Sequence, residues 1–199
     1  DRTPFGGVKY GVSLWEFEVW DGPQANSEPS QPAANTGLGL VPLPAELKDN
    51  SASQDSFELS QDTKLVAPGD AKDAAELFAA QARLSTGYPL PVVDSGEASG
   101  NITFKTGTVA GHSSTEAYAL TSTKSGVTIT ANAAHGFFNA TQTLRQLLPG
   151  FINSKYPVYA AWEVPAVEIK DSPRYSYRAI MLDPARSFLT VDEVKHVLD

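Results

Sequence analysis

Apolar positions along the chain repeat with two different periods, and these periods predict the elements of the fold. Residues 70–86 and 135–148 carry apolar side chains every three or four positions, as helices that cover a core do. Shorter stretches at 56–67, 101–107, 117–133 and 162–171 read as strands. The order of strands and helices predicts an α+β fold in which two helices cover a sheet.

Each expected helix has an apolar stripe and a signal at its end. For the first helix we expect Asp70 as N-cap and Gly87 as C-cap. Its expected buried face is Ala74, Leu77, Phe78, Gln81 and Leu84. The expected stripe of the second helix is Phe137, Ala140, Thr141, Leu144 and Leu148, and Pro149-Gly150 should end it. Residues 117–133 read as a hairpin that turns at Lys124 to Gly126.

The two ends of the chain differ from this central region. Residues 1–20 contain one strand pattern, in which Trp15 and Trp20 are more simply core residues than sugar-stacking ones. Residues 21–37 are rich in Pro, Ser, Asn and Ala without apolar periodicity, so we interpret them as a linker.

The last residues read as a strand followed by a helix. Tyr177 to Leu182 is a nearly continuous apolar run, which is typical of a strand buried on both faces of a parallel sheet. Thr190 and Glu193 have the spacing of a capping box, and Val191, Val194 and Leu198 form the expected apolar face of the helix. A single strand and helix need further units to close a core. We therefore expect these ends to dock on the sheet or on another copy of the chain.

Charge and composition exclude several classes of function. The 199 residues carry a formal net charge of −8, which argues against binding to nucleic acid or to an anionic membrane surface. The absence of cysteine excludes disulfides, thiolate catalysis and cysteine-ligated zinc. His112, His135 and His196 are not in a metal-ligand spacing, so we expect structural or solvent-exposed roles for them and neither a metal site nor a cofactor.

Two long segments carry a family resemblance. The segments "EAYALTSTKSGVTITANAAHGFFNATQTLRQLLP" and "IKDSPRYSYRAIMLDPARSFLTVDEVKHVLD" resemble glycoside hydrolase family 20, the β-N-acetylhexosaminidases. The resemblance implies an accessory domain at 38–172, an antiparallel sheet with two helices that is called zincin-like although it binds no zinc. It implies that 173–199 are the first strand and the start of the first helix of a (β/α)8 barrel. Residues 1–20 are similar to the last strand of a discoidin-like, galactose-binding module.

The resemblance also implies a chemistry and one binding residue. Family 20 enzymes remove terminal N-acetylhexosamine with retention of configuration, and the substrate's own acetamido group assists the reaction. Their catalytic Asp-Glu pair lies on a later barrel strand, so none is expected in this chain. The family pattern leucine-aspartate-x-x-arginine is "LDPAR" here, which implies that Arg186 binds sugar hydroxyls. Pro184 and Ser187 depart from residues common in the family, which leaves the shape of the loop open. The alternative is that Arg186 is a surface residue paired with Asp183.

Other candidates have simpler interpretations. Asp192-Glu193, like Asp70 and Asp73, lies in a first helical turn, where acidic side chains favour the helix dipole. Asn101 and Asn139 match the glycosylation pattern by coincidence.

We expect an inactive fragment of a multidomain β-N-acetylhexosaminidase, with glycans that contain N-acetylhexosamine and the missing barrel, or another copy, as partners. Its expected location, inferred from the resemblance, is secreted or extracellular and bacterial. The alternative is a non-catalytic carbohydrate-binding or interaction module. Sequence beyond Asp199 that holds about seven more strand-helix units and an Asp-Glu pair would distinguish them.

Overall fold

A computed structural model describes residues 37–52 and 54–198, except for the side chain of Leu198. The strand expected at 1–20, with Trp15 and Trp20, and all but the last residue of the linker expected at 21–37 lie outside the described residues. Within the described part, no helix is long and apolar enough to cross a membrane.

The centre of the fold is a seven-stranded sheet with the strand order β1-β9-β6-β7-β5-β3-β4. In sequence order these strands are β1 (Glu46–Asp49), β3 (Leu65–Val66), β4 (Val92–Val93), β5 (Ile102–Thr106), β6 (Tyr118–Thr123), β7 (Gly126–Ala131) and β9 (Val167–Asp171). A separate two-stranded sheet pairs β2 (Phe57–Glu58) with β8 (Glu163–Val164). The helices are α1 (Lys72–Thr86), α2 (Ala134–Leu147) and α3 (Val191–Leu198), and short 3-10 turns lie at Gly69–Ala71 and Gly150–Asn153.

The main sheet is mixed, so the expectation of an antiparallel sheet is wrong. The pairs β3–β4, β3–β5 and β5–β7 are parallel, whereas β1–β9, β6–β9 and the hairpin β6–β7 are antiparallel. Parallel neighbours need a long crossover connection, and α1 supplies one between β3 and β4. The hairpin itself turns at Lys124-Ser125, as the sequence predicts.

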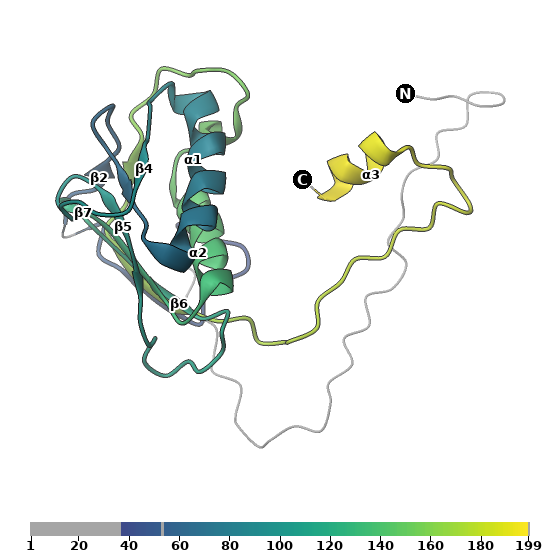
Figure 1. Cartoon of the computed structure of the whole chain (residues 1–199), viewed down its shortest axis with the longest axis horizontal. Coiled ribbons are helices and arrows are strands. Elements are labelled where there is room, and N and C mark those ends of the chain that lie inside the picture. Colours follow the sequence, from purple (N-terminus) through teal and green to yellow (C-terminus); the bar gives the residue numbers. More distant parts are fainter. Residues whose placement is uncertain (1–36, 53, 199) are drawn as a thin grey trace. The chain divides into compact units, whose positions relative to one another are not determined.

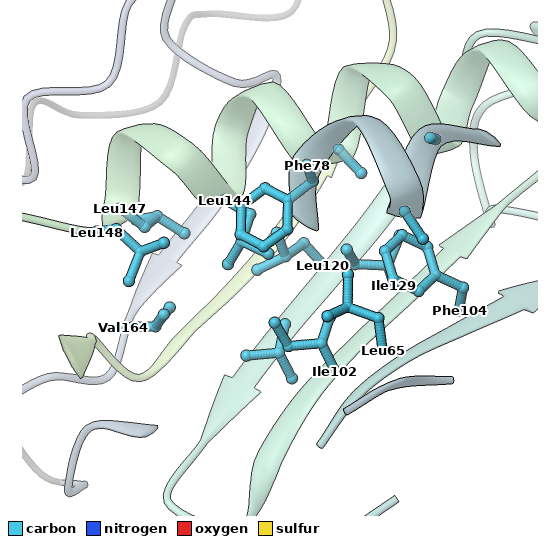
Figure 2. Packing of buried hydrophobic residues seen from close by; sticks show 14 of the residues in the cluster. Leu65, Phe78, Ile102, Phe104, Leu120, Ile129, Leu144, Leu147, Leu148 and Val164 are labelled. Carbon is cyan, nitrogen blue, oxygen red and sulfur yellow. The ribbon is translucent and has the colours of Figure 1, made fainter. Parts of the chain in front are cut away.

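Both α1 and α2 cover the same face of this sheet (Figure 1). Between the layers lies one apolar core, to which Ile102 and Phe104 of β5, Leu120 of β6 and Ile129 of β7 contribute buried side chains (Figure 2). The rings of Phe104 and Phe137 meet edge to face, with centroids 5.9 Å apart. The predicted stripe of α2 is confirmed, because all of its five members are buried.

The predicted face of α1 is confirmed for Ala74 and Phe78 and wrong for Leu77, Gln81 and Leu84, which are exposed. Leu77 and Leu84 are 61% and 51% exposed, and Phe78 is buried together with a set of small side chains: Ala74, Ala75, Ala79, Ala82, Ser85 and Thr86. Small side chains let one helix approach its neighbours closely, so the alanine-rich face packs inward and the leucines remain outside. The C-cap is confirmed: Gly87 has φ 70° and its N–H bonds to the carbonyl of Arg83. Asp70 lies in the preceding 3-10 turn and does not cap α1 with its side chain.

The carboxyl-terminal segment agrees with the sequence only in part. Residues 177–182 form no strand, and Tyr177, Ile180 and Met181 are 84%, 62% and 90% exposed. Of the two expected outcomes, docking on the sheet is therefore wrong, since residues 177–182 pair with none of its strands, and docking on another copy of the chain stays a prediction. The capping box of α3 is confirmed: the amide of Thr190 donates to Glu193 Oε2 at 2.8 Å, and the amide of Glu193 donates to Thr190 Oγ1 at 3.3 Å. Val191 is 70% exposed.

Candidate substrate-binding segment and its junction with the α+β domain

Arg186, the candidate sugar-binding residue, lies in a turn that Asp183 organises. The amide of Ala185 donates to Asp183 Oδ1 at 3.0 Å, and Arg186 Nε lies 3.3 Å from Asp183 Oδ2. The Arg186 side chain is 91% exposed. The surface pairing with Asp183 that we weighed as the alternative is thus present.

This pairing is compatible with a binding role. An exposed ion pair of this kind contributes little stability, so it holds the guanidinium only loosely. The contact involves Nε, one of three nitrogens that together offer five N–H donors. In chemical terms the turn presents a planar cluster of donors, suited to neighbouring hydroxyl or carboxylate oxygens, beside an acceptor on Asp183.

The segment that carries Arg186 is joined to the α+β domain by a cluster of polar contacts. His112 Nδ1 lies 2.9 Å from Ser172 Oγ, and Arg178 forms an ion pair with Glu116 in which Nη2 and Oε1 are 2.5 Å apart. We call these four residues, His112, Glu116, Ser172 and Arg178, the junction cluster. Sequence reasoning gave His112 a structural or solvent role and did not single out Glu116, because no local motif links positions so far apart.

A second polar group lies directly beside this cluster, where β9 ends. The hydroxyl of Tyr118 is 2.6 Å from Thr143 Oγ1 and 3.4 Å from Asp171 Oδ2, while Asp171 Oδ1 accepts the amide of Ala45 at 3.0 Å. Burial raises the pKa of Tyr118 well above its ordinary value, and the nearby carboxylate of Asp171 adds to the effect. Tyr118 therefore stays a neutral hydrogen-bonding group that ties β6 to α2 and β9.

Charged partners hold β1 against β9. Glu46 Oε2 is 3.0 Å from Lys170 Nζ, and Glu46 Oε1 is 3.6 Å from His112 Nε2. The hydrogen bond from Lys170 lowers the pKa of Glu46, and the charges of Lys170 and His112 act in the same direction. His112 thus contacts both the first strand and the residue that follows the last one.

The remaining candidates are exposed or have structural hydrogen bonds. His135 and His196 are exposed, and among the described residues no group of three or more His, Asp or Glu side chains could hold a metal ion. Glu193 of the Asp192-Glu193 pair accepts the capping bonds of α3. Asn101 bonds to the amide of Lys64 and to two carbonyls of its own loop, and Asn139 donates to the carbonyl of Glu116, so both asparagine side chains have structural partners.

The described fold is an α+β domain of a glycoside hydrolase family, as two comparisons show. The sequence model described as "Glycosyl hydrolase family 20, domain 2" matches residues 37–172. A β-hexosaminidase of Porphyromonas gingivalis is 38% identical over 169 residues, which are 84% of this chain and 21% of that protein. The chain belongs to glycoside hydrolase family 20.

Solved structures agree with this assignment. The family 20 β-N-acetylhexosaminidase of Streptomyces coelicolor A3(2) superposes with a TM-score of 0.71 at 35% identity, over 80% of this chain and 31% of that one. The N-acetyl-β-hexosaminidase of Streptomyces plicatus, in complex with thio-NAglucal, gives 0.73 at 34% identity, over 85% and 33%. The chain therefore spans about a fifth to a third of the length of these relatives.

Proposed function

We propose that this chain is a non-catalytic part of a β-N-acetylhexosaminidase that hydrolyses terminal, non-reducing N-acetylhexosamine residues. The observation that carries the proposal is family membership over residues 37–172, followed by the pattern "LDPAR" at residues 182–186. Relatives named β-hexosaminidases, whose length is several times the matched segment, support it. Their bacterial members support a bacterial origin for the enzyme, and its proposed location outside the cell rests on the family resemblance alone.

In this proposal, residues 38–172 are the accessory domain of the zincin-like type, and residues 173–199 are the first strand and the start of the first helix of the (β/α)8 barrel. The apolar residues of 177–182 would become buried once neighbouring barrel strands pair with them, since barrel strands are covered on both faces. Residues 1–20 would be the end of a discoidin-like module and 21–37 the linker.

Arg186 binds sugar hydroxyls in the proposed enzyme. Its turn follows the first barrel strand, and barrel active sites lie at the carboxyl ends of the strands. The guanidinium would exchange part of its pairing with Asp183 for two neighbouring hydroxyl oxygens of the terminal sugar. The reaction itself, substrate-assisted and retaining, would depend on an Asp-Glu pair carried by a later strand, so this chain alone lacks catalytic groups.

Two measurements test the proposal. The 199-residue chain should not hydrolyse an aryl N-acetyl-β-glucosaminide, and the full-length protein should. In the full-length protein, Arg186→Ala should lower kcat/KM by an amount equivalent to about 2–5 kcal/mol, the usual cost of truncating a hydrogen-bonded charge that is buried in the complex, because bound sugar and the neighbouring barrel loops would cover the guanidinium. Asp192→Asn, in the first turn of α3, is the control and should leave kcat/KM unchanged. Unchanged kcat/KM in Arg186→Ala would remove Arg186 from the site, and turnover by the 199-residue chain would place catalytic groups within it.

A further inference from the structure

We propose that Glu116 is a positioning residue: by holding Arg178, it fixes the direction in which the chain leaves the α+β domain toward the turn of Arg186. The inference rests on the proposed function, because it gives the accessory domain a part in orienting the sugar-binding turn. It uses contacts that family membership does not assign.

The ion pair between Glu116 and Arg178 has the geometry of a specific contact. Arg178 Nη2 lies 2.5 Å from Oε1 and Nη1 lies 3.4 Å from Oε2, so both carboxylate oxygens face the guanidinium. Nη1 also donates to the carbonyl of Tyr175, which fixes the guanidinium to its own segment. The Glu116 side chain is 24% exposed, less than any other acidic partner among the ion pairs of the described residues. Paired, planar contacts of this kind define orientation as well as distance.

The backbone of Glu116 is held by hydrogen bonds that do not involve Arg178. Its amide donates to Ser114 Oγ at 3.1 Å, and its carbonyl accepts Asn139 Nδ2, from α2, also at 3.1 Å. The loop that carries Glu116 is fixed in turn by Asn132, which donates to the carbonyls of His112 and Ser114 at 2.9 and 2.8 Å and accepts the amide of Val109 at 2.7 Å. Because Asn132, directly after β7, and Asn139 of α2 both bond to this loop, the backbone of Glu116 is held to the α+β domain and its carboxylate projects from a fixed point.

The same loop holds the departing chain at a second point. His112 bonds to Ser172, the residue that follows β9, so the junction cluster contacts the segment at 172 and again at 178. One contact would leave the segment free to rotate about it, whereas two contacts six residues apart define a direction. Arg186 lies eight residues beyond the second contact. Errors in the position of a substrate-binding group lower the rate steeply, so the direction of this segment matters for catalysis.

The first experiment measures the direction of the segment itself. Since the chain has no cysteine, Thr121→Cys in β6 and Ala179→Cys beside Arg178 give a unique pair of spin-label sites, both at exposed positions. Glu116→Gln and Arg178→Gln should each broaden the distance distribution between the labels, and the double variant should broaden it no further. Glu76→Gln is the matched control, because Glu76 pairs with Arg83 inside α1. An unchanged distribution in Glu116→Gln, or additive broadening in the double variant, would overturn the proposal.

The second experiment separates positioning from general stability in the full-length enzyme. Glu116→Gln should lower kcat/KM by about 10- to 100-fold at an unchanged melting temperature, and the loss should be much smaller in an Arg186→Ala background. Equal losses in both backgrounds would show that Glu116 does not act through Arg186. If the unaltered full-length protein has no hexosaminidase activity, the proposed function is wrong, and so is the claim that Glu116 affects catalysis. The spin-label distances would still decide whether Glu116 orients the segment.

Discussion

Gly136, in the first turn of α2, provides a sharp test of how this domain is packed. A Cβ atom built at this position would lie 2.3 Å from the carbonyl oxygen of Ala117 and 2.9 Å from the Cβ of Ala131. Ordinary contact between carbon and oxygen requires about 3.3 Å, so α2 would have to move away from β6 and β7 by about 1 Å. The obstacle is backbone, which cannot rotate aside as a side chain can.

The magnitude follows from two opposing effects. Overpacking in a close-packed interior lowers the free energy of unfolding by up to about 3 kcal/mol. Replacing glycine by alanine within a helix raises it by about 1 kcal/mol, because alanine has the higher helix propensity. We therefore expect Gly136→Ala to lower the free energy of unfolding by about 2 kcal/mol. For a domain of this size that corresponds to a decrease in Tm of roughly 4–8 °C.

Urea denaturation of the 199-residue chain, followed by far-ultraviolet circular dichroism, measures this change. Gly150→Ala is the matched control, because it makes the same substitution where no atom lies within 4 Å of the new Cβ. Its stability should be unchanged or slightly increased, since alanine restricts the unfolded chain. If Gly136→Ala were as stable as Gly150→Ala, the close contact between α2 and the β6–β7 hairpin would be wrong.

Two further predictions concern α1 and the edge strand β1. Phe78→Ala should lower the free energy of unfolding by about 3–5 kcal/mol and Leu77→Ala by less than about 0.5 kcal/mol, because only Phe78 is buried; equal losses in urea denaturation would contradict the observed helix face. Lys170 lowers the pKa of Glu46, so the ionised carboxylate adds to the stability of the fold at pH values above 4.5, its ordinary pKa. This contribution is lost as the pH falls through the lower pKa that Glu46 has in the folded state. Tm measured between about pH 3 and 6 should accordingly fall less steeply in Glu46→Gln than in the unaltered chain, and parallel curves would exclude the effect.

Elements defined by neighbouring residues were predictable from the sequence. The stripe of α2, the hairpin at Lys124-Ser125, the C-cap at Gly87 and the capping box of Thr190 with Glu193 all have the predicted form. Each depends on contacts within about four residues or on a simple apolar period, and such contacts are encoded locally. Family membership, which depends on the order of long segments, was also readable and is confirmed for the α+β domain.

The site was only partly predictable. The pattern "LDPAR" indicated Arg186, and the structure adds its exposed pairing with Asp183. The contact of Glu116 with Arg178 joins positions 62 residues apart, and no spacing in the sequence predicts it. It depends on the path of the loop that Asn132 holds between β7 and α2, and that path is set by contacts between distant residues.

The sequence by itself determined the end of α1 at Gly87, the hairpin turn at Lys124-Ser125, the capped start of α3 and the family to which the chain belongs. Tertiary structure alone decided that the sheet is mixed, that the alanine face of α1 and not its leucine face is buried, and that β1 pairs with β9. The physical reason is the range of the interactions. Periodicity and capping act between neighbours in the chain, whereas strand order and helix orientation are set by which distant surfaces exclude water from each other most completely.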